Sequence, residues 1–256
     1  MSFAVSADAY DRFMGRYSSK LAPEFADFGG VSPGQRVLDV GCGPGALTAE
    51  LVQRLGSASV TAVDPSETFV AAVKERYPEV EVVAGSAERL DFADNVFDGT
   101  LAQLVVHFMA EPIGGIGEMA RVTRPRGPVA ACVWDHAGGR SPLSVFWQAA
   151  HELDPDAQDE SELAGAREGH LSELFDRAGL SEIEETAIPV TVEHPTFDEW
   201  WEPFTLGVGP AGAHTAELEP ERRAELREAC RRALPPAPFT VTASAWAARG
   251  VKTVSP

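Results

Sequence analysis

A short apolar run that ends in a glycine-rich turn constrains the fold of this chain more than any other feature. Residues 36–40 read Arg-Val-Leu-Asp-Val, and Gly41, Gly43 and Gly45 follow directly. An amphipathic stretch of helical length comes next and ends at Gly56. Such a strand, glycine turn and helix bring bare backbone and the N–H groups of a helix N-terminus close to a ligand. The pattern predicts the first unit of an α/β fold with a binding site at the turn.

Apolar runs of strand length alternate with amphipathic stretches from residue 31 to residue 136. We expect further strands at 60–63, 80–84, within 97–106 and at 129–134, and helices from Ser66 to Tyr77 and after Pro112. The helix after Pro112 contains three glycines, each of which costs about 1 kcal/mol in a helix interior. Nearly continuous apolar strands that alternate with helices are typical of a parallel sheet covered on both faces.

The pattern changes in the second half of the chain. Helices are predicted near 142–152 and 170–178, and strands at 183–192 and from Phe239 onward. We interpret the 256 residues as one domain. Its predicted parts are an N-terminal helical flap (1–30), a binding core (31–136), linking helices with a late strand (137–193), a helical cap insertion (194–238) and a final strand (239–248).

The charge of the chain bears on its partners. There are 21 Lys and Arg against 39 Asp and Glu, a formal net charge of −18. So acidic a protein repels phosphate backbones, which disfavours a nucleic-acid partner. The arginines of residues 222–232 are interleaved with glutamates, which predicts a solvated helix with i,i+4 ion pairs.

Cysteine usage and hydropathy indicate a compartment. The three cysteines, Cys42, Cys132 and Cys230, are odd in number and widely spaced, which favours a reducing environment over a disulfide framework or a zinc site. No apolar stretch approaches the length of a membrane span, and charged residues occupy the N-terminus where a signal peptide needs an apolar core. We therefore expect a cytoplasmic protein without a membrane partner, as a monomer or homodimer.

Acidic residues lie at or just after the ends of the first three predicted strands. Asp64 ends the second strand, where a carboxylate can accept hydrogen bonds from ribose hydroxyls, and Ser86-Ala87-Glu88 follow the third. Asp39 precedes the first glycine by two residues. A carboxylate there suits a ligand with an ammonium and a sulfonium better than a pyrophosphate. The loose dinucleotide pattern of Gly41, Gly43 and Ala46 nevertheless leaves a nicotinamide cofactor as the alternative.

This ordered set resembles the class I S-adenosylmethionine-dependent methyltransferases over roughly residues 10–135. The E/D-x-G-x-G-x-G element of that family is matched by residues 39–45, its second-strand acid by Asp64 and its acidic loop by Ala87-Glu88. Residues 97–107 resemble its fourth strand, and residues 118–125 the helix and turn before its fifth. The resemblance implies a Rossmann-like, mostly parallel seven-stranded sheet in the order 3-2-1-4-5-7-6, with the last strand antiparallel.

The resemblance also implies which residues surround the cofactor. S-adenosyl-L-methionine, with S-adenosyl-L-homocysteine as its product, is expected to lie among Tyr17, Asp39, Gly41, Cys42, Gly43, Gly45, Asp64, Pro65, Ser86, Ala87, Glu88, Gln103 and Leu104. In this arrangement Asp39 faces the ammonium, Asp64 the ribose and Glu88 the adenine. The N-terminal segment from Tyr10 to Tyr17 is expected to act as a flap over the cofactor.

Candidate residues for chemistry follow the fourth and fifth strands. His107 and His136 are the candidate bases, and packing is the alternative role for each. Trp134, Trp200, Trp201 and Phe204 are candidate substrate contacts. Residues 197, 200, 201 and 204 are spaced along one helix face, which also fits a stripe that packs in the core. No spacing supports a metal site.

Together these observations predict a methyltransferase that acts on a small molecule by in-line displacement. Alignment and exclusion of water would be the main contributions of such a protein. An NAD(P)-dependent oxidoreductase, a non-catalytic cofactor-binding module and an RNA or protein methyltransferase are the alternatives.

Overall fold

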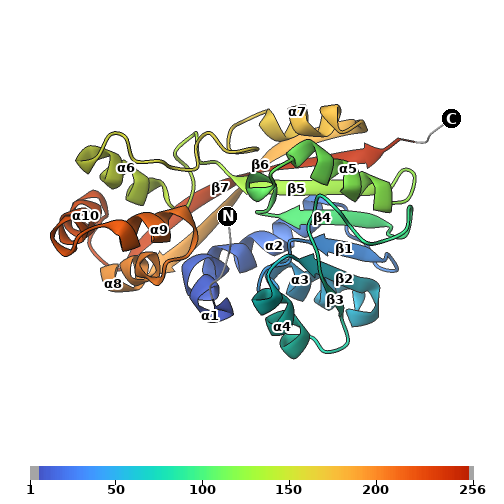
Figure 1. Ribbon diagram of the computed structural model, residues 1–256, viewed down its shortest axis with the longest axis horizontal. Helices are drawn as coiled ribbons and strands as arrows, with labels where there is room; N and C mark the ends of the chain where they lie inside the picture. Colours follow the sequence, from blue (N-terminus) through green and yellow to red (C-terminus); the bar gives the residue numbers. More distant parts are fainter. Residues whose placement is uncertain (1–5, 254–256) are drawn as a thin grey trace.

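The computed structural model describes residues 6–253, which form a seven-stranded sheet flanked by helices (Figure 1). The strands are β1 (Val37–Val40), β2 (Val60–Asp64), β3 (Glu81–Ala84), β4 (Gly99–Gln103), β5 (Pro128–Trp134), β6 (Leu180–His194) and β7 (Phe239–Lys252). Their order is β3-β2-β1-β4-β5-β7-β6. The first five are parallel, and β7 is antiparallel to both β5 and β6. The predicted fold and strand order are confirmed.

Two hydrophobic layers cover the sheet because alternate strand residues point to opposite faces. One face packs against α2 (Arg16–Phe28), α3 (Ala46–Leu55) and α4 (Glu67–Arg76), and the other against α5 (Pro112–Val122) and α7 (His170–Arg177). In β1, for example, Val37 belongs to the first layer and Leu38 to the second. This three-layer arrangement leaves the carboxyl ends of the parallel strands at one edge, where ligands of open α/β sheets bind.

Local signals in the sequence set most helix ends. The Ser66 hydroxyl accepts the Phe69 N–H at 3.5 Å and caps α4, and Gly56 ends α3 with a φ of 81°. Helix α5 forms despite its three glycines because Ile116 and Met119 are completely buried against the sheet. Here tertiary burial outweighs weak helix propensity.

The N-terminal segment is helical but not one regular helix. Helix α1 (Ala7–Tyr10) passes into a π-helical turn (Asp11–Gly15) and then into α2. The π turn directs Phe13 and Met14 inward, where both are buried. The first five residues of the predicted flap lie outside the described residues.

Strands β6 and β7 are longer than predicted and extend past the other strands to a cluster of helices (Figure 1). The cluster contains α6 (Ser144–Leu153), α8 (Phe197–Trp201), a 3₁₀ turn (Glu202–Leu206), α9 (Gly209–Glu217) and α10 (Pro220–Ala233). The predicted helix over 197–204 is therefore interrupted after Trp201, where Pro203 enters the 3₁₀ turn.

The ion pairs on α10 differ from the predicted i,i+4 pattern. Arg222 pairs with Glu225 and Arg231 with Glu228, both at i,i+3, and Arg227 reaches Asp198 of α8. The last contact joins two helices of the cluster, so part of the charge on α10 serves tertiary packing.

None of the helices within residues 6–253 has the length and apolar character needed to cross a membrane.

The aromatic centre of the helical cluster can be tested by truncation. Phe146 of α6 is fully buried and stacks on Phe204 with ring centroids 4.6 Å apart. We expect Phe146→Ala to lower the free energy of unfolding by about 3–5 kcal/mol, through lost transfer free energy and a residual cavity. Urea denaturation measures this. The exposed Gln148→Ala on the same helix is the control, and equal stabilities of the two variants would contradict the assignment.

Candidate active site

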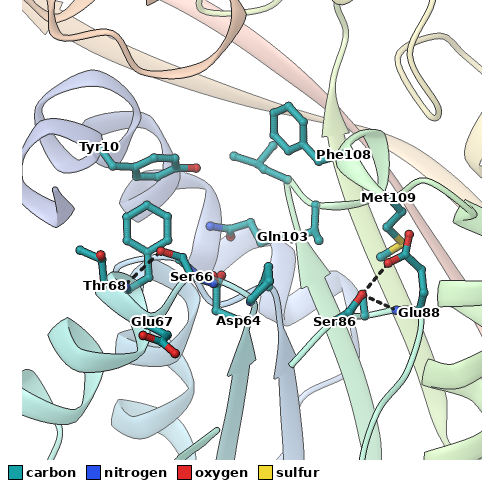
Figure 2. Close-up of a pocket in the computed structure, with 17 residues that line it drawn as sticks. Tyr10, Asp64, Ser66, Glu67, Thr68, Ser86, Glu88, Gln103, Phe108 and Met109 are labelled. Atoms are coloured by element: carbon teal, nitrogen blue, oxygen red, sulfur yellow. Dashed lines mark hydrogen bonds between the residues drawn. The ribbon is translucent and has the colours of Figure 1, made fainter. Parts of the chain in front are cut away.

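A cavity of about 500 Å³ lies at the carboxyl ends of β1, β2, β3 and β4. Figure 2 shows Tyr10 and Phe108 facing Asp64 and Ser86 across it. Nine of the predicted cofactor residues line this cavity: Gly41, Gly43, Asp64, Pro65, Ser86, Ala87, Glu88, Gln103 and Leu104. None of the described residues that line it is a lysine or an arginine, whereas three of them carry a carboxylate.

The glycine turn is built so that only glycine fits at its first position. Gly41, Gly43 and Gly45 have φ values of 70°, 52° and 100°, in the region that favours glycine. A Cβ at Gly41 would lie 2.5 Å from Cγ2 of Val105. Because the turn leads directly into α3, it presents main-chain N–H groups and the positive end of a helix to the cavity.

Asp39 lies beneath this turn, almost completely buried. Its Oδ2 accepts the Thr48 hydroxyl at 2.6 Å, while its Oδ1 has no hydrogen-bond partner in the part of the chain that the structure describes. Burial raises the pKa of Asp39 to about 7. A small side cavity of about 30 Å³ joins Asp39 and Cys42 to Gly41, Gly43 and Gln103.

Asp64 is held by two backbone donors from the loops that line the cavity. Gly43 N–H donates to its Oδ2 and Ser66 N–H to its Oδ1, both at 2.8 Å. Burial nevertheless raises the pKa of Asp64, against the effect of these two donors. Each carboxylate oxygen retains a second lone pair, so Asp64 can still accept hydrogen bonds from a ligand.

Glu88 fastens the loop after β3 to the start of α5. Its Oε1 accepts the N–H groups of Ala110 at 2.6 Å and Glu111 at 3.2 Å, and its Oε2 accepts the Ser86 hydroxyl. These donors, the Ser86 hydroxyl first, lower the pKa of Glu88. The carboxylate is thus ionised and fixed at the cavity wall (Figure 2).

The end of β4 contributes two further wall residues. Gln103 donates its Nε2–H to the Ser18 carbonyl at 3.2 Å, and its Oε1 is buried without a hydrogen-bond partner among residues 6–253. Leu104 has a φ of 62°, which is unusual for a residue with a branched side chain. A strained backbone conformation of this kind persists where the surrounding structure holds it in place, as at binding sites.

A second, smaller cavity of about 40 Å³ adjoins the first. The two share Tyr10, Leu104 and Phe108 as wall residues. The second cavity is also lined by both candidate bases, His107 and His136. The structure therefore brings the histidines beside the main cavity rather than into it.

Both histidines are held uncharged. Their ring centroids are 5.9 Å apart, and each has an Nδ1 without a hydrogen-bond partner within the described chain. Burial lowers the pKa of His107 well below its usual value and that of His136 to about 4. Each can accept a proton at neutral pH, although only weakly. Asp135, by contrast, accepts the Gly138 N–H and pairs with Arg140, so it holds the loop after β5.

Several predicted residues lie elsewhere. Tyr17 lines neither cavity: its hydroxyl is 2.9 Å from Nε2 of His194 on β6. Trp200, Trp201 and Phe204 are 3–5% exposed and belong to the hydrophobic core. Gly45 supports the turn without lining the main cavity. Of the four predicted substrate contacts, the structure brings only Trp134 to the second cavity.

Tyr10 and Glu160 are among the wall residues that sequence reasoning missed. The sequence predicts only that Tyr10 belongs to a flap, whereas the structure shows that it lines both cavities. Glu160 lies in the irregular segment between α6 and α7 and lines the second cavity, with 2% of its surface exposed. No local motif marks it, because one acidic residue in a polar loop is ordinary.

Within residues 6–253 no group of three or more His, Cys, Asp or Glu side chains could hold a metal ion.

Comparison with known proteins finds a family match over part of the chain. Residues 38–131 match the family described as Methyltransferase domain. Demethylmenaquinone methyltransferase of Beutenbergia cavernae is 40% identical over 98 residues, which cover 38% of this chain and 40% of that protein. An uncharacterized methyltransferase of Mycobacterium tuberculosis is 36% identical over 135 residues, which cover 53% of this chain and 52% of that protein. The chain thus spans about half, or less, of the length of these curated relatives.

A solved structure extends the likeness to nearly the whole chain. Phosphoethanolamine N-methyltransferase 2 of Haemonchus contortus, solved in complex with S-adenosyl-L-methionine, has a TM-score of 0.60 at 18% identity and covers 97% of this chain and 57% of that one. At that identity the likeness shows the fold. The matched domain, the curated relatives and the strand order together support a class I S-adenosylmethionine-dependent methyltransferase.

Proposed function

We propose that the 500 Å³ cavity binds S-adenosyl-L-methionine and that the protein transfers its methyl group to a small-molecule acceptor in the adjoining cavity. When bound, this cofactor supplies a methyl group already activated on a sulfonium. The chain's own residues then have to hold both molecules, align them and exclude water.

One observation carries the proposal. Asp39 Oδ1 and Gln103 Oε1 are buried oxygens without hydrogen-bond partners in the described chain, and both residues line the same small cavity beside Gly41 and Gly43. Both atoms are acceptors, and leaving a buried acceptor unsatisfied costs about 1–3 kcal/mol. A ligand that satisfies both must donate hydrogen bonds, and an ammonium group with three N–H donors does so.

The remaining walls suit the rest of the cofactor. Asp64 has lone pairs for the ribose hydroxyls, and Ser86, Ala87 and Glu88 line the part of the cavity assigned to adenine. Three carboxylates and no basic side chain among the described lining residues favour a cationic ligand over a diphosphate. This charge balance disfavours the nicotinamide alternative.

Binding of matched ligands tests the choice of cofactor. S-adenosylhomocysteine at 100 times its dissociation constant should stabilise the protein by about 2.7 kcal/mol. NAD(H) and NADP(H) at the same concentration should leave the melting temperature unchanged. Stabilisation by a nicotinamide and not by S-adenosylhomocysteine would refute the proposal. A metabolite screen with labelled methyl donor then separates an enzyme from a module that only binds the cofactor.

The ribose assignment predicts a loss of affinity. We expect Asp64→Ala to weaken S-adenosylhomocysteine binding by about 1–3 kcal/mol, the scale of an unsatisfied buried polar group. Isothermal titration calorimetry measures this, and circular dichroism checks the fold. The exposed Glu75→Ala on α4 is the control. An unchanged dissociation constant for Asp64→Ala would show that the ribose lies elsewhere.

The ammonium assignment predicts a pH dependence. An ammonium favours the ionised form of Asp39, whose pKa in the free protein is raised to about 7. Below that pH the free carboxyl is protonated and must lose its proton on binding. The dissociation constant of S-adenosylhomocysteine should therefore rise by up to about tenfold for each pH unit below 7.

The variant Asp39→Asn separates this effect from that of Asp64, whose pKa is also raised. The amide side chain that it introduces cannot ionise, so the variant should bind more weakly at pH 8 and lose most of the pH dependence. Titration calorimetry between about pH 5.5 and 8 gives both quantities. A pH dependence as steep in the variant as in the wild type would assign it to another group.

A further inference from the structure

The second cavity is lined by four residues with a buried polar atom that the fold leaves without a partner. His107 Nδ1, His136 Nδ1, Trp134 Nε1 and Glu160 Oε2 make no hydrogen bond with any described residue. Trp134 and Glu160 are each only 2% exposed. Buried polar side chains are normally satisfied, so a group of four around one space indicates a ligand site.

The charge of this cavity excludes an anionic ligand. Both imidazoles are uncharged because burial lowers their pKa values. No lysine or arginine is found among the described residues that line the space, and Glu160 is acidic. A carboxylate or phosphate would therefore enter without a compensating positive charge.

The second cavity presents one unpaired donor and one unpaired acceptor, and this combination favours a hydroxyl over an ammonium as the ligand group. The indole N–H of Trp134 can only donate, whereas the Glu160 carboxyl accepts when ionised and can both accept and donate when protonated. An ammonium would satisfy Glu160 and leave the indole N–H unpaired. A hydroxyl satisfies both, since its oxygen accepts from Trp134 and its hydrogen is donated to Glu160.

Glu160 is available for this role although two donors lie near it. The Trp147 indole N–H and the backbone N–H of Glu160 itself act to lower the pKa of Glu160, yet burial dominates and raises that pKa to about 7. Neither Trp147 Nε1 nor Glu160 Oε2 reaches hydrogen-bond geometry with a described residue. The Glu160 carboxyl group thus has an oxygen without a hydrogen-bond partner within the described part of the fold, and a ligand hydroxyl would supply that hydrogen bond.

From this arrangement we propose that Glu160 and Trp134 bind the acceptor through a hydroxyl group, and that the acceptor is a small uncharged molecule that is otherwise apolar. The inference rests on the proposed function, which makes this cavity the acceptor site. Phe13, Leu143 and Val208 supply apolar walls. A space of about 40 Å³ holds only a few water molecules, so it takes the hydroxyl-bearing end of the acceptor.

Fluorinated fragments test the proposal without knowledge of the acceptor. Binding of 4-fluorophenol, fluorobenzene and 4-fluorobenzylamine is measured by ¹⁹F NMR, with and without saturating S-adenosylhomocysteine. We expect 4-fluorophenol to bind about tenfold more tightly than fluorobenzene, because only the phenol satisfies the buried polar pair. The amine should bind more weakly than the phenol.

Variants locate the binding in this cavity. Glu160→Leu and Trp134→Phe should each reduce the affinity for 4-fluorophenol toward that of fluorobenzene, while Glu160→Gln should retain part of it. Glu162→Leu, an exposed glutamate two residues away, is the matched control and should bind like the wild type. Titration with S-adenosylhomocysteine should give the same dissociation constant for Glu160→Leu and wild type, which also shows that the variant is folded.

The outcomes separate this inference from the proposed function. Preference for the amine, equal binding of phenol and fluorobenzene, no detectable binding of the phenol, or no effect of Glu160→Leu would overturn the hydroxyl site. Failure of the wild type to bind S-adenosylhomocysteine would instead overturn the proposed cofactor. Each result can occur without the other.

Discussion

The close approach of the Gly41 backbone to its neighbouring strands is the constraint on which the site depends. Its N–H donates to the Val63 carbonyl at 2.7 Å, and the side chain of Val105 occupies the space that a Cβ would need. The same turn lets Gly43 donate to Asp64. These contacts hold β1 against β2 and β4. They therefore determine where α3 begins. They also determine where the acidic residues of two strands lie relative to the main-chain N–H groups of the turn.

The small side cavity at the glycine turn and the second cavity differ in which of their buried atoms lack a hydrogen-bond partner. Beside the glycine turn the unsatisfied atoms, Asp39 Oδ1 and Gln103 Oε1, are both acceptors. In the neighbouring cavity a donor on Trp134 stands with an acceptor on Glu160. Unsatisfied buried groups raise the free energy of the folded chain, so each cavity selects the ligand that corrects its own deficit. The ligand groups that we propose for these two requirements are a cationic group at one end and a neutral hydroxyl at the other.

The aromatic spacing over residues 197–204 predicts a substrate contact there, but a different segment between β6 and β7 lines the second cavity. The aromatic face at Trp200, Trp201 and Phe204 packs inward on α6. Residues 208–210, at the start of α9, reach the wall of the second cavity instead. Phe13 of the π turn packs edge-on against Phe204, with ring centroids 5.5 Å apart. The aromatic core therefore supports the wall of the second cavity through the N-terminal segment, and substitutions in the core should act on that cavity indirectly.

The sequence by itself determined the sheet, the helices that alternate with its parallel strands, and the residues between Gly41 and Glu88 that line the main cavity, because each follows from neighbouring residues: apolar periodicity, glycines in a turn and acids at strand ends. Only the tertiary structure decided that Tyr17 pairs with His194, 177 positions away, and that Glu160 meets Trp134 at one cavity. Such partners come from segments without a local pattern. Their meeting depends on how helices and loops pack on the finished sheet, which no periodicity along the chain encodes.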